Sequence, residues 1–312
     1  MRQLYILDPF EKLHIENDTS ILLMNEAIRR GIEVHSCTEF DISRDNRGFS
    51  ARARRHEKEI SSSILEDRAS CGSFELELFD CVFIRKDPPF DASYLTLLLL
   101  LQELRRPLVI NSPLALLRYN EKLSIFLFPE YITETLVSSS LPRIREFVRD
   151  AGGSAVLKPL FGCSGRDVKL LQDSDPAFDD EVRSSTARGT GKVMLQRYLP
   201  AVTEGETRVF LLEDRVLAVM KKVPAPGSFK ANFDFGARGL PHALTPREET
   251  ICRAVGAFCK KEGIILSALD LIDGHLSEFN ITSPGLLVES NRVDNARYEE
   301  EVIRFVTDRS GR

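Results

Sequence analysis

The stretch QLYILDPFEKLHIENDTSILLMNEAIRRGIEVHSC, residues 3–37, decides the fold class of this chain. Its apolar run Gln3–Leu7 predicts a strand that ends at Asp8, and Ser20–Arg30 has the apolar periodicity of a helix. Gly31, a common helix terminator, follows that helix, and Ile32–Cys37 predicts the next strand. A strand, a helix and a strand at this spacing are typical of a parallel α/β sheet.

The same alternation continues downstream. We expect a strand at Phe79–Ile84, a loop at Arg85–Asp91, a helix at Ala92–Arg105 and a strand at Leu108–Ile110 that ends in Asn111–Pro113. Open α/β sheets bind ligands at the carboxyl ends of their strands, where these loops fall. The alternative is that Asp and Pro simply end strands. The arginine-rich segment Arg44–Glu59 is polar, and we expect it to be an exposed excursion.

The pattern changes near residue 120. We expect helices at Leu141–Asp150, Ala177–Arg188 and Pro246–Glu262, and strands at Ala155–Pro159, Val168–Leu171, Val193–Tyr198, Thr207–Leu212, Val216–Val223 and in a hairpin over Ile264–Asn280. The segment Pro224–Ala243 holds three Pro and three Gly among twenty residues. No regular element fits there, so we expect a mobile functional loop.

Composition sets limits on the protein class. The chain has 312 residues, 43% of them hydrophobic, and a formal net charge of −5, which suggests two domains or one large one with a substantial core. Mild acidity argues against a general nucleic-acid binder. The longest apolar run, Leu97–Leu101, is far shorter than a membrane span, and the N-terminus reaches Asp8 too soon for a signal peptide. The six cysteines have no metal-like spacing, so we expect free thiols in a cytoplasmic protein. From the charge and the short apolar runs we expect neither a nucleic-acid partner nor a membrane partner.

A lysine followed by a glycine-containing loop stands in the middle of the chain, in Lys158-Pro-Leu-Phe-Gly-Cys-Ser-Gly165. Glycines let backbone N–H groups approach an anion, and the lysine adds a positive charge. The loop is not a Walker A motif, because no Gly-Lys-Ser/Thr follows the glycines. A plain β-hairpin turn is the alternative.

The predicted hairpin ALDLIDGHLSEFN, residues 268–280, carries candidate metal ligands. Glu278 and Asn280 share one strand face, and oxygen ligands on one face suit Mg²⁺. A two-residue turn at 273–274 pairs residue 270 with residue 277 and places Asp270 on the other face. A three-residue turn, Asp273–His275, pairs Asp270 with Glu278. We predict the three-residue turn. The alternative to a metal site is that these residues form a polar strand face in contact with solvent.

Taken together, seven segments of the chain resemble the prokaryotic glutathione synthetases of the ATP-grasp superfamily, over nearly the whole length. They occur in the family's order at Arg85–Asp91, Asn111–Leu123, Glu134–Val137, Val156–Leu160, Gln196–Pro200, Gly205–Arg208 and Leu269–Pro284. The resemblance implies an ATP-grasp fold of class α/β. Its parts would be an N-terminal parallel α/β domain (1–120), a central lid subdomain (121–200) and a C-terminal antiparallel-sheet subdomain (201–312), with ATP between the last two.

The resemblance also implies the site. Catalytic roles fall to Arg208, which would lie over the transferring phosphoryl group and the developing oxyanion, and to Lys222, which stands where the family has an Arg. The nucleotide would contact Lys122, Lys158, Gly162, Ser164, Gly165, Gln196, Tyr198, Leu199 and, through its ribose, Glu206. Mg²⁺, or Mn²⁺ in its place, would bind Asp270, Glu278 and Asn280, and the substrates would contact Arg85, Asp87, Asp91, Asn232 and Ser283.

The implied activity is an ATP-dependent carboxylate–amine ligase that joins γ-glutamylcysteine to glycine through an acyl phosphate, in a dimer or tetramer. The chain departs from the family pattern in its glycine loop, which has Phe161-Gly162 and Ser164-Gly165. It also has Glu206 where the family commonly has Asp, Lys222 where the family has Arg, and Val288 where the family has a later Arg. These departures keep two alternatives open: a ligase for another dipeptide or amine, and a nucleotide-binding protein without catalysis.

Overall fold

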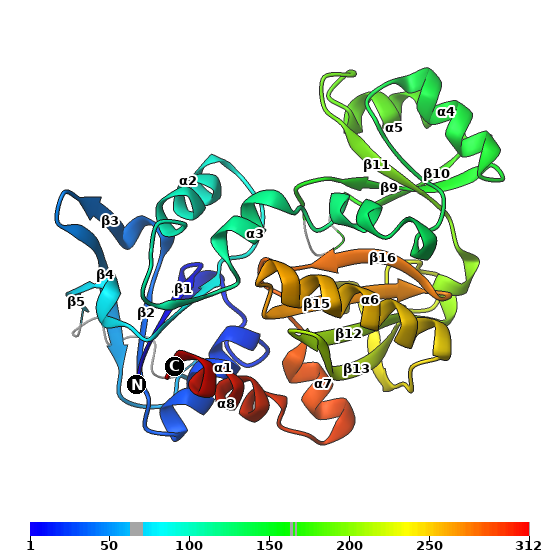
Figure 1. Ribbon diagram of the computed structural model, residues 1–312. Coiled ribbons are helices and arrows are strands. Elements are labelled where there is room, and N and C mark those ends of the chain that lie inside the picture. The colour runs from blue at the N-terminus through cyan, green and yellow to red at the C-terminus, as the bar shows by residue number, and fades with distance from the viewer. Residues whose placement is uncertain (63–70, 163–164, 166, 312) are drawn as a thin grey trace.

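The computed structural model describes residues 1–62, 71–162, 165 and 167–311, and its strands form three sheets that follow one another along the chain (Figure 1). Ser164, one of the expected nucleotide contacts, lies outside the described residues. Within those residues, no helix has both the length and the apolar character needed to cross a membrane.

The first sheet has a parallel centre, as the opening stretch predicts. Its strand order is β3-β4-β2-β1-β6-β7, with β5 beside β4, and the β1–β2, β1–β6 and β6–β7 pairs are parallel. The central elements are β1 (Arg2–Leu7), α1 (Thr19–Arg29), β2 (Glu33–Cys37), β6 (Cys81–Arg85), α2 (Ala92–Leu101), β7 (Leu108–Ile110) and α3 (Pro113–Arg118). The predicted strands and helices here are confirmed, although α2 ends before Arg105.

The expectation of an exposed excursion at Arg44–Glu59 is wrong. The segment contributes β3 (Ile42–Asp45) and β4 (Gly48–His56), which extend the sheet by antiparallel pairing together with β5 (Cys71–Glu75). Phe49, Ala51 and Ala53 are buried at alternate positions of β4, whereas Arg52 between them is exposed. The period of two that defines a strand is present, but small alanines form the buried face and arginines dominate the composition.

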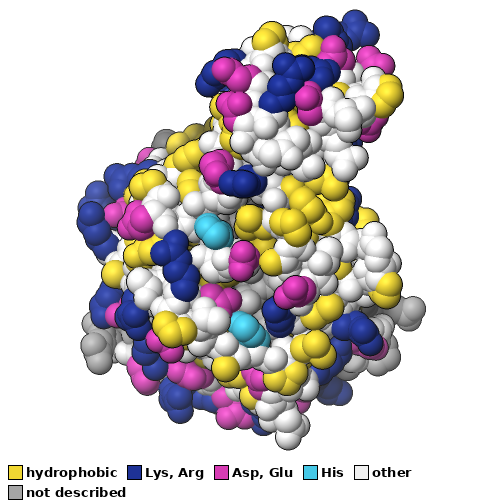
Figure 2. All heavy atoms as spheres, turned by 90° about the vertical axis from the view of Figure 1, so that its right-hand side faces the viewer, with side chains coloured by type: hydrophobic (Ala, Val, Ile, Leu, Met, Phe, Trp, Pro, Cys, Tyr) yellow, Lys and Arg dark blue, Asp and Glu magenta, His cyan; other side chains and the backbone are white. Residues whose placement is uncertain are grey.

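The second sheet, order β10-β9-β11-β8, forms a separate lobe of antiparallel strands. Its elements are β8 (Thr135–Ser138), α4 (Leu141–Asp150), β9 (Ser154–Pro159), β10 (Lys169–Gln172), α5 (Phe178–Ser185) and β11 (Val193–Arg197). Ala155 and Leu157 of β9 pack in a small core with Ile144 of α4 and Val182 of α5. Because side chains alternate along a strand, Val156 and Lys158 face the other way, toward the third sheet. Figure 2 shows the lobe standing out from the body, with acidic and basic side chains interspersed on its surface.

The third sheet is antiparallel throughout, in the order β14-β13-β12-β15-β16. Its elements are β12 (Glu206–Leu212), β13 (Arg215–Val223), β14 (Arg238–Pro241), α6 (Pro246–Glu262), β15 (Leu266–Ile272) and β16 (His275–Asn280). Helix α6 covers one face, where Ile251 and Val255 meet Leu269 and Phe279. The other face carries the polar side chains of the site.

The prediction that Pro224–Ala243 holds no regular element is wrong in part. It contains the short 3-10 helix Phe233–Phe235 and the edge strand β14, which pairs with β13 from Met220 to Val223. Gly239 fits this strand because it lacks a side chain: a Cβ atom there would lie 3.0 Å from Val293. The many Pro and Gly residues obscure a strand of only four residues.

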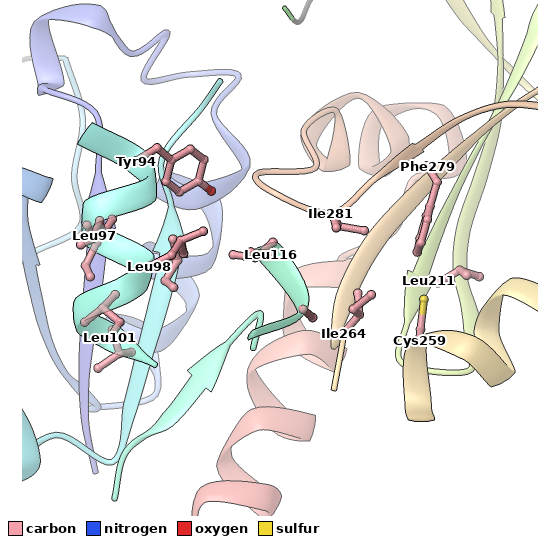
Figure 3. Packing of buried hydrophobic residues seen from close by; sticks show 14 of the residues in the cluster. Tyr94, Leu97, Leu98, Leu101, Leu116, Leu211, Cys259, Ile264, Phe279 and Ile281 are labelled. Carbon is pink, nitrogen blue, oxygen red and sulfur yellow. The ribbon is translucent and has the colours of Figure 1, made fainter. Parts of the chain in front are cut away.

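The first and third sheets share buried cores. Figure 3 shows Leu98 of α2 and Leu116 of α3 pointing toward each other, with Ile264 and Ile281, which flank the third sheet, on the far side of α3 in the same buried cluster. Asn111, just after β7, fastens the two sheets with its side-chain amide. Its Nδ2 donates to the carbonyls of Leu266 (2.6 Å) and Ile281 (2.7 Å), and its Oδ1 accepts from the amides of Ile265 and Leu266, both at 2.8 Å.

The C-terminal helices return to the first sheet. Helix α7 (Leu287–Asp294) packs against β13 and β14, and α8 (Tyr298–Ser310) lies beside α1, as the red and blue helices of Figure 1 show. Val302, Ile303 and Val306 of α8 are completely buried.

Candidate active site

A cavity of about 330 Å³ is lined by residues of the second and third sheets and by loops of the first. Sequence-predicted residues on its wall are Asp87, Lys122, Lys158, Gly162, Gly165, Gln196, Tyr198, Leu199, Glu206, Arg208, Lys222, Asn232, Asp270, Glu278, Asn280 and Ser283. The fold thus brings together residues that lie almost two hundred positions apart in the chain.

Strand register in the third sheet places the charged residues side by side. Glu206 of β12 faces Lys222 of β13, Arg208 of β12 faces Asp270 of β15, and Asp270 faces Glu278 of β16. Directly opposed residues share a face of the sheet. Five charged side chains from four strands therefore form one row along the floor of the cavity.

Asp270 is the centre of this row. Its Oδ1 accepts from Lys222 Nζ at 2.8 Å, and its Oδ2 accepts from Asn280 Nδ2 at 3.0 Å and lies 3.1 Å from Arg208 Nη1. Burial disfavours the charged carboxylate, but Arg208 and Lys222 outweigh it and hold the pKa of Asp270 well below its usual range. Asp270 is therefore an anion at neutral pH.

Glu206 has the opposite tendency although it shares Lys222 with Asp270. Its carboxylate forms an ion pair with Lys222 Nζ. Burial, together with the neighbouring Asp270 charge, raises the pKa of Glu206, and Lys222 opposes the rise. The buried ammonium of Lys222 thus neutralises a pair of carboxylates that repel each other.

The predicted pairing of Asp270 with Glu278 is confirmed, but the predicted three-residue turn is wrong. Ile272 pairs with His275 across the two-residue turn Asp273-Gly274, in which both residues have positive φ (50° and 69°). A bulge between the Leu271–Leu276 and Asp270–Glu278 pairs then leaves Ser277 as an extra residue. The bulge restores the register that the short turn alone would break.

The bulge also explains a site residue that we did not predict. Ser277 lines the cavity beside Glu278, and its Oγ accepts from Lys158 Nζ at 2.8 Å. The Asp-Gly dipeptide was the available signal, because it favours a two-residue turn with positive φ at both positions. Such a turn can bring Asp270 opposite Glu278 only if one residue bulges.

Two lysines enter from outside the third sheet. Lys122 Nζ lies 3.0 Å from Glu278 Oε1 and donates to the Gly162 carbonyl at 2.6 Å, so it connects β16 to the glycine loop. Burial lowers the pKa of Lys158, and the charges of Glu278 and Glu206 oppose that shift. Both ammonium groups face the row of carboxylates across the cavity.

Arg208 has hydrogen-bond donors that its neighbours do not use. Its side chain is about nine-tenths buried, yet Nε and Nη1 have no hydrogen-bond partner among the described residues. Buried guanidinium N–H groups are normally satisfied, and planar oxyanions such as phosphate or carboxylate satisfy them well. The arrangement fits a phosphoryl group or an oxyanion above Asp270.

The opposite end of the cavity is less polar. Tyr198 and Leu199 follow β11, and the Phe229 ring stands nearly perpendicular to Tyr198 with ring centroids 6.4 Å apart. Phe229 belongs to the segment 224–243, whose Lys230 Nζ donates to the Gly165 carbonyl at 3.2 Å. This segment therefore contacts the glycine loop and covers that end of the cavity, which suits a flat, mainly apolar group such as a nucleobase.

Two expected substrate contacts lie off the cavity wall. Arg85 is buried behind it, where Nε donates to Ser20 Oγ (3.0 Å) and Nη2 to the Pro284 carbonyl (3.1 Å). Asp91 caps the start of α2 by accepting from the Tyr94 amide at 3.0 Å. Arg85 thus supports the segment after Ser283, and Asp91 has a local structural role.

The expected metal ligands are close together but engaged. In the described part of the chain, no group of three or more His, Cys, Asp or Glu side chains converges as a ready metal centre. Asp270, Glu278 and Asn280 supply two carboxylates and an amide on one sheet face, a donor set that suits Mg²⁺. Lys222, Arg208 and Lys122 neutralise those carboxylates instead.

Solved structures with this architecture identify the class of protein. The chain is similar to D-cycloserine synthetase DcsG (TM-score 0.68, 19% identity, 97% of this chain and 99% of that one) and to the ATP-grasp ligase PsnB complexed with minimal precursor (TM-score 0.64, 15% identity, 98% of each). These likenesses show that the protein has the ATP-grasp fold.

Sequence comparisons make the identification narrower. Residues 1–118 match the prokaryotic glutathione synthetase N-terminal domain, and residues 121–295 match the ATP-grasp domain of the same enzymes. The glutathione synthetase of Prochlorococcus marinus is 36% identical over 305 residues (97% of each chain), and that of a Nostoc species is 34% identical over 318 residues (98% of each). The chain belongs to the prokaryotic glutathione synthetase family.

Proposed function

We propose that this protein joins γ-glutamylcysteine to glycine, with ATP converted to ADP and phosphate. The observation that carries the proposal is the row of charged side chains on the third sheet, in which Arg208 lies beside Asp270 while its Nε and Nη1 have no hydrogen-bond partner in the described chain. The 36% and 34% identity to two glutathione synthetases, over nearly the full length of each chain, supports the choice of substrates.

The nucleotide lies along the cavity in this proposal. Gln196, Tyr198 and Leu199 receive the adenine, and Glu206 receives the ribose. Lys122, Lys158 and the glycine-loop residues Gly162 and Gly165 hold the phosphates. The lysines already contact Glu278 and Ser277, so they need only turn toward phosphate oxygens above the same strand.

Asp270, Glu278 and Asn280 hold Mg²⁺, or Mn²⁺, in this proposal. The bound metal would supply positive charge that neutralises the phosphates during transfer. Lys222, Arg208 and Lys122 neutralise the same carboxylates in this structure. We therefore expect metal and nucleotide to bind together, because lysines that turn toward phosphate oxygens would leave the carboxylates of Asp270 and Glu278 available to the metal.

The side chains account for the two chemical steps. A free carboxylate has no usable leaving group, so its oxygen first attacks the terminal phosphorus of ATP; the bond from that phosphorus to ADP breaks, and an acyl phosphate forms. Arg208 and Lys222 stabilise the charge on the transferring group. The acceptor amine then attacks the resulting acyl phosphate, Arg208 stabilises the tetrahedral oxyanion, and phosphate leaves. The segment 224–243 excludes water, which would hydrolyse the acyl phosphate.

The substrates occupy the end of the cavity next to the first sheet. Asp87 and Ser283 line it there, and Asn232 lines it from the segment 224–243. Arg85 acts behind them through the Pro284 carbonyl. We place the boundaries of the three subdomains at residues 120 and 200, and the protein in the cytoplasm. We expect it to form a dimer or tetramer, and sedimentation analysis would test this oligomeric state.

A substrate panel tests this proposal. The protein is incubated with ATP, Mg²⁺, several dipeptides and several amines, and ADP release and product mass are followed. We expect product from γ-glutamylcysteine and glycine. Turnover with a different pair only would favour the alternative ligase, for which the departures at Phe161 and Val288 give a reason. ATP binding without acceptor-dependent ADP release for any pair would indicate a non-catalytic protein.

A further inference from the structure

Glu121 is a buried carboxylate that the mechanism above does not use. Its Oε1 accepts three hydrogen bonds, from the amides of Ile281 and Thr282, both at 3.0 Å, and from Thr282 Oγ1 at 2.7 Å. Its main-chain carbonyl accepts from the Phe279 amide at 3.0 Å. One residue thus holds the chain from the end of β16 to the start of the segment 281–284, which carries the cavity residue Ser283.

The residues on either side of Glu121, Asn120 and Lys122, hold the glycine loop on the other side of the cavity. Asn120 Nδ2 donates to the Leu160 carbonyl at 3.1 Å, and Lys122 Nζ donates to the Gly162 carbonyl at 2.6 Å. Asn120 Oδ1 also accepts from the amides of Lys122 and Leu123, both at 3.0 Å, which makes this stretch a compact turn. Three consecutive residues therefore join the glycine loop to the segment 281–284.

We propose that Glu121 is a positioning residue, which sets the distance between the phosphates of the nucleotide and the carboxylate that accepts phosphate. This inference rests on the proposed function, because it assigns the segment 281–284 to the carboxylate substrate. Lys122 and the glycine loop hold the phosphates, Glu121 holds Ser283 and its neighbours, and the peptide chain between them has no freedom to stretch.

The chemistry makes such a spacing important. Phosphoryl transfer between bound groups needs the reacting atoms about 3–3.5 Å apart, and a misplacement of about 1 Å can cost about 100-fold in rate. A carboxylate suits the task because one oxygen accepts several hydrogen bonds at once, which ties two backbone amides and a hydroxyl to a single point.

Two variants test the inference. Glu121→Ala removes all three bonds, and we expect kcat to fall by about 100-fold while the dissociation constant of ADP, measured by calorimetry, stays within about 3-fold. Thr282→Val removes only the hydroxyl bond and leaves both amides, so a smaller fall of kcat is expected even where Glu121→Ala folds poorly. Glu121→Gln keeps an acceptor oxygen and is expected to restore most of kcat.

Glu26→Gln is the matched control, because Glu26 is a buried carboxylate between α1 and α8, away from the cavity. It should lower thermal stability and leave kcat unchanged. The inference is wrong if Glu121→Ala weakens ADP binding as much as it lowers kcat, or if Glu121→Gln is as slow as Glu121→Ala. Absence of turnover in the unmodified protein would instead refute the proposed function.

Hydrogen exchange decides the question without substrate. Glu121→Ala should speed exchange of residues 281–284 and leave 196–199 at the nucleobase end unchanged. With ADP bound, the unmodified protein should protect 281–284 and the variant should not. Equal protection in both proteins would overturn the inference, whichever substrate pair the panel identifies.

Discussion

At the scale of single residues, Arg208 offers a direct test of the chemistry. Its side chain lines the cavity, and its buried Nε and Nη1 have no hydrogen-bond partner in the described chain. We expect Arg208→Ala to lower kcat by roughly 100- to 1000-fold, the usual cost of removing one oxyanion donor, and to change ADP binding little. Steady-state kinetics and calorimetry measure both values. Arg215→Ala, an exposed arginine on β13, is the control, and full turnover in Arg208→Ala would reject the assignment.

Glu206 and Lys222 form a second test at the same scale. The family resemblance implies an Asp and an Arg at these positions, so one carboxylate is longer here and its cation is shorter. Lys222 contacts both Glu206 and Asp270 in this arrangement. We expect Lys222→Arg to crowd the ion pair between residues 206 and 222, and Glu206→Asp to move its two charges apart, so each single variant should lower kcat/KM. The double variant should recover most of the activity. The coupling should be about 1–2 kcal/mol in a double-mutant cycle; additive effects would show that the two positions are independent.

At the scale of elements, the hairpin β15–β16 shows how far local sequence extends. The sequence predicts the strand hairpin, and the choice of turn length predicts that Asp270 faces Glu278; the hairpin and this pairing are confirmed. The turn was wrong because two backbone solutions give the same pairing, a longer turn or a short turn with a bulge. Strand β4 was missed for another reason: Ala51 and Ala53 bury little apolar surface, so the exposed arginines dominate the pattern.

The pairing of β2 with β4 carries a prediction about pH. His56 on β4 lies 2.7 Å from Ser36 Oγ on β2, and burial, with smaller effects from Arg54 and His35, lowers the pKa of His56 from 6.5 to about 4. The unfolded chain therefore takes up the proton first, and stability is lost as pH falls from about 6.5 toward 4. Urea unfolding at pH 7 and pH 4.5 should show a smaller loss for His56→Gln than for the unmodified protein. Equal losses would mean that His56 does not titrate on unfolding.

At the scale of the whole molecule, the cores are divided unequally among the three sheets. Two buried clusters join the first and third sheets, and one of them also takes in Met194 of β11. Ile303 of α8 belongs to the other, with Ile21 of α1 and Phe210 of β12. The lobe of the second sheet has a cluster of its own around Ile144. Helical periodicity showed that α6 has a buried face, but no periodicity tells which sheet a helix such as α8 will cover. That placement depends on contacts between residues almost three hundred positions apart.

This division predicts that the molecule unfolds in two parts. Ile144 and Ile303 are both completely buried, so the same change, Ile→Ala, costs about 2–5 kcal/mol at either position. In hydrogen exchange, Ile144→Ala should speed exchange chiefly within residues 135–197, because the described members of its buried cluster all belong to that lobe. Ile303→Ala should speed exchange in β1 and β12 together, since one cluster holds both. Arg304→Ala, on the exposed side of α8, should change neither. If Ile144→Ala also loosened β1 and β12, the lobe would be part of one cooperative unit with the first and third sheets.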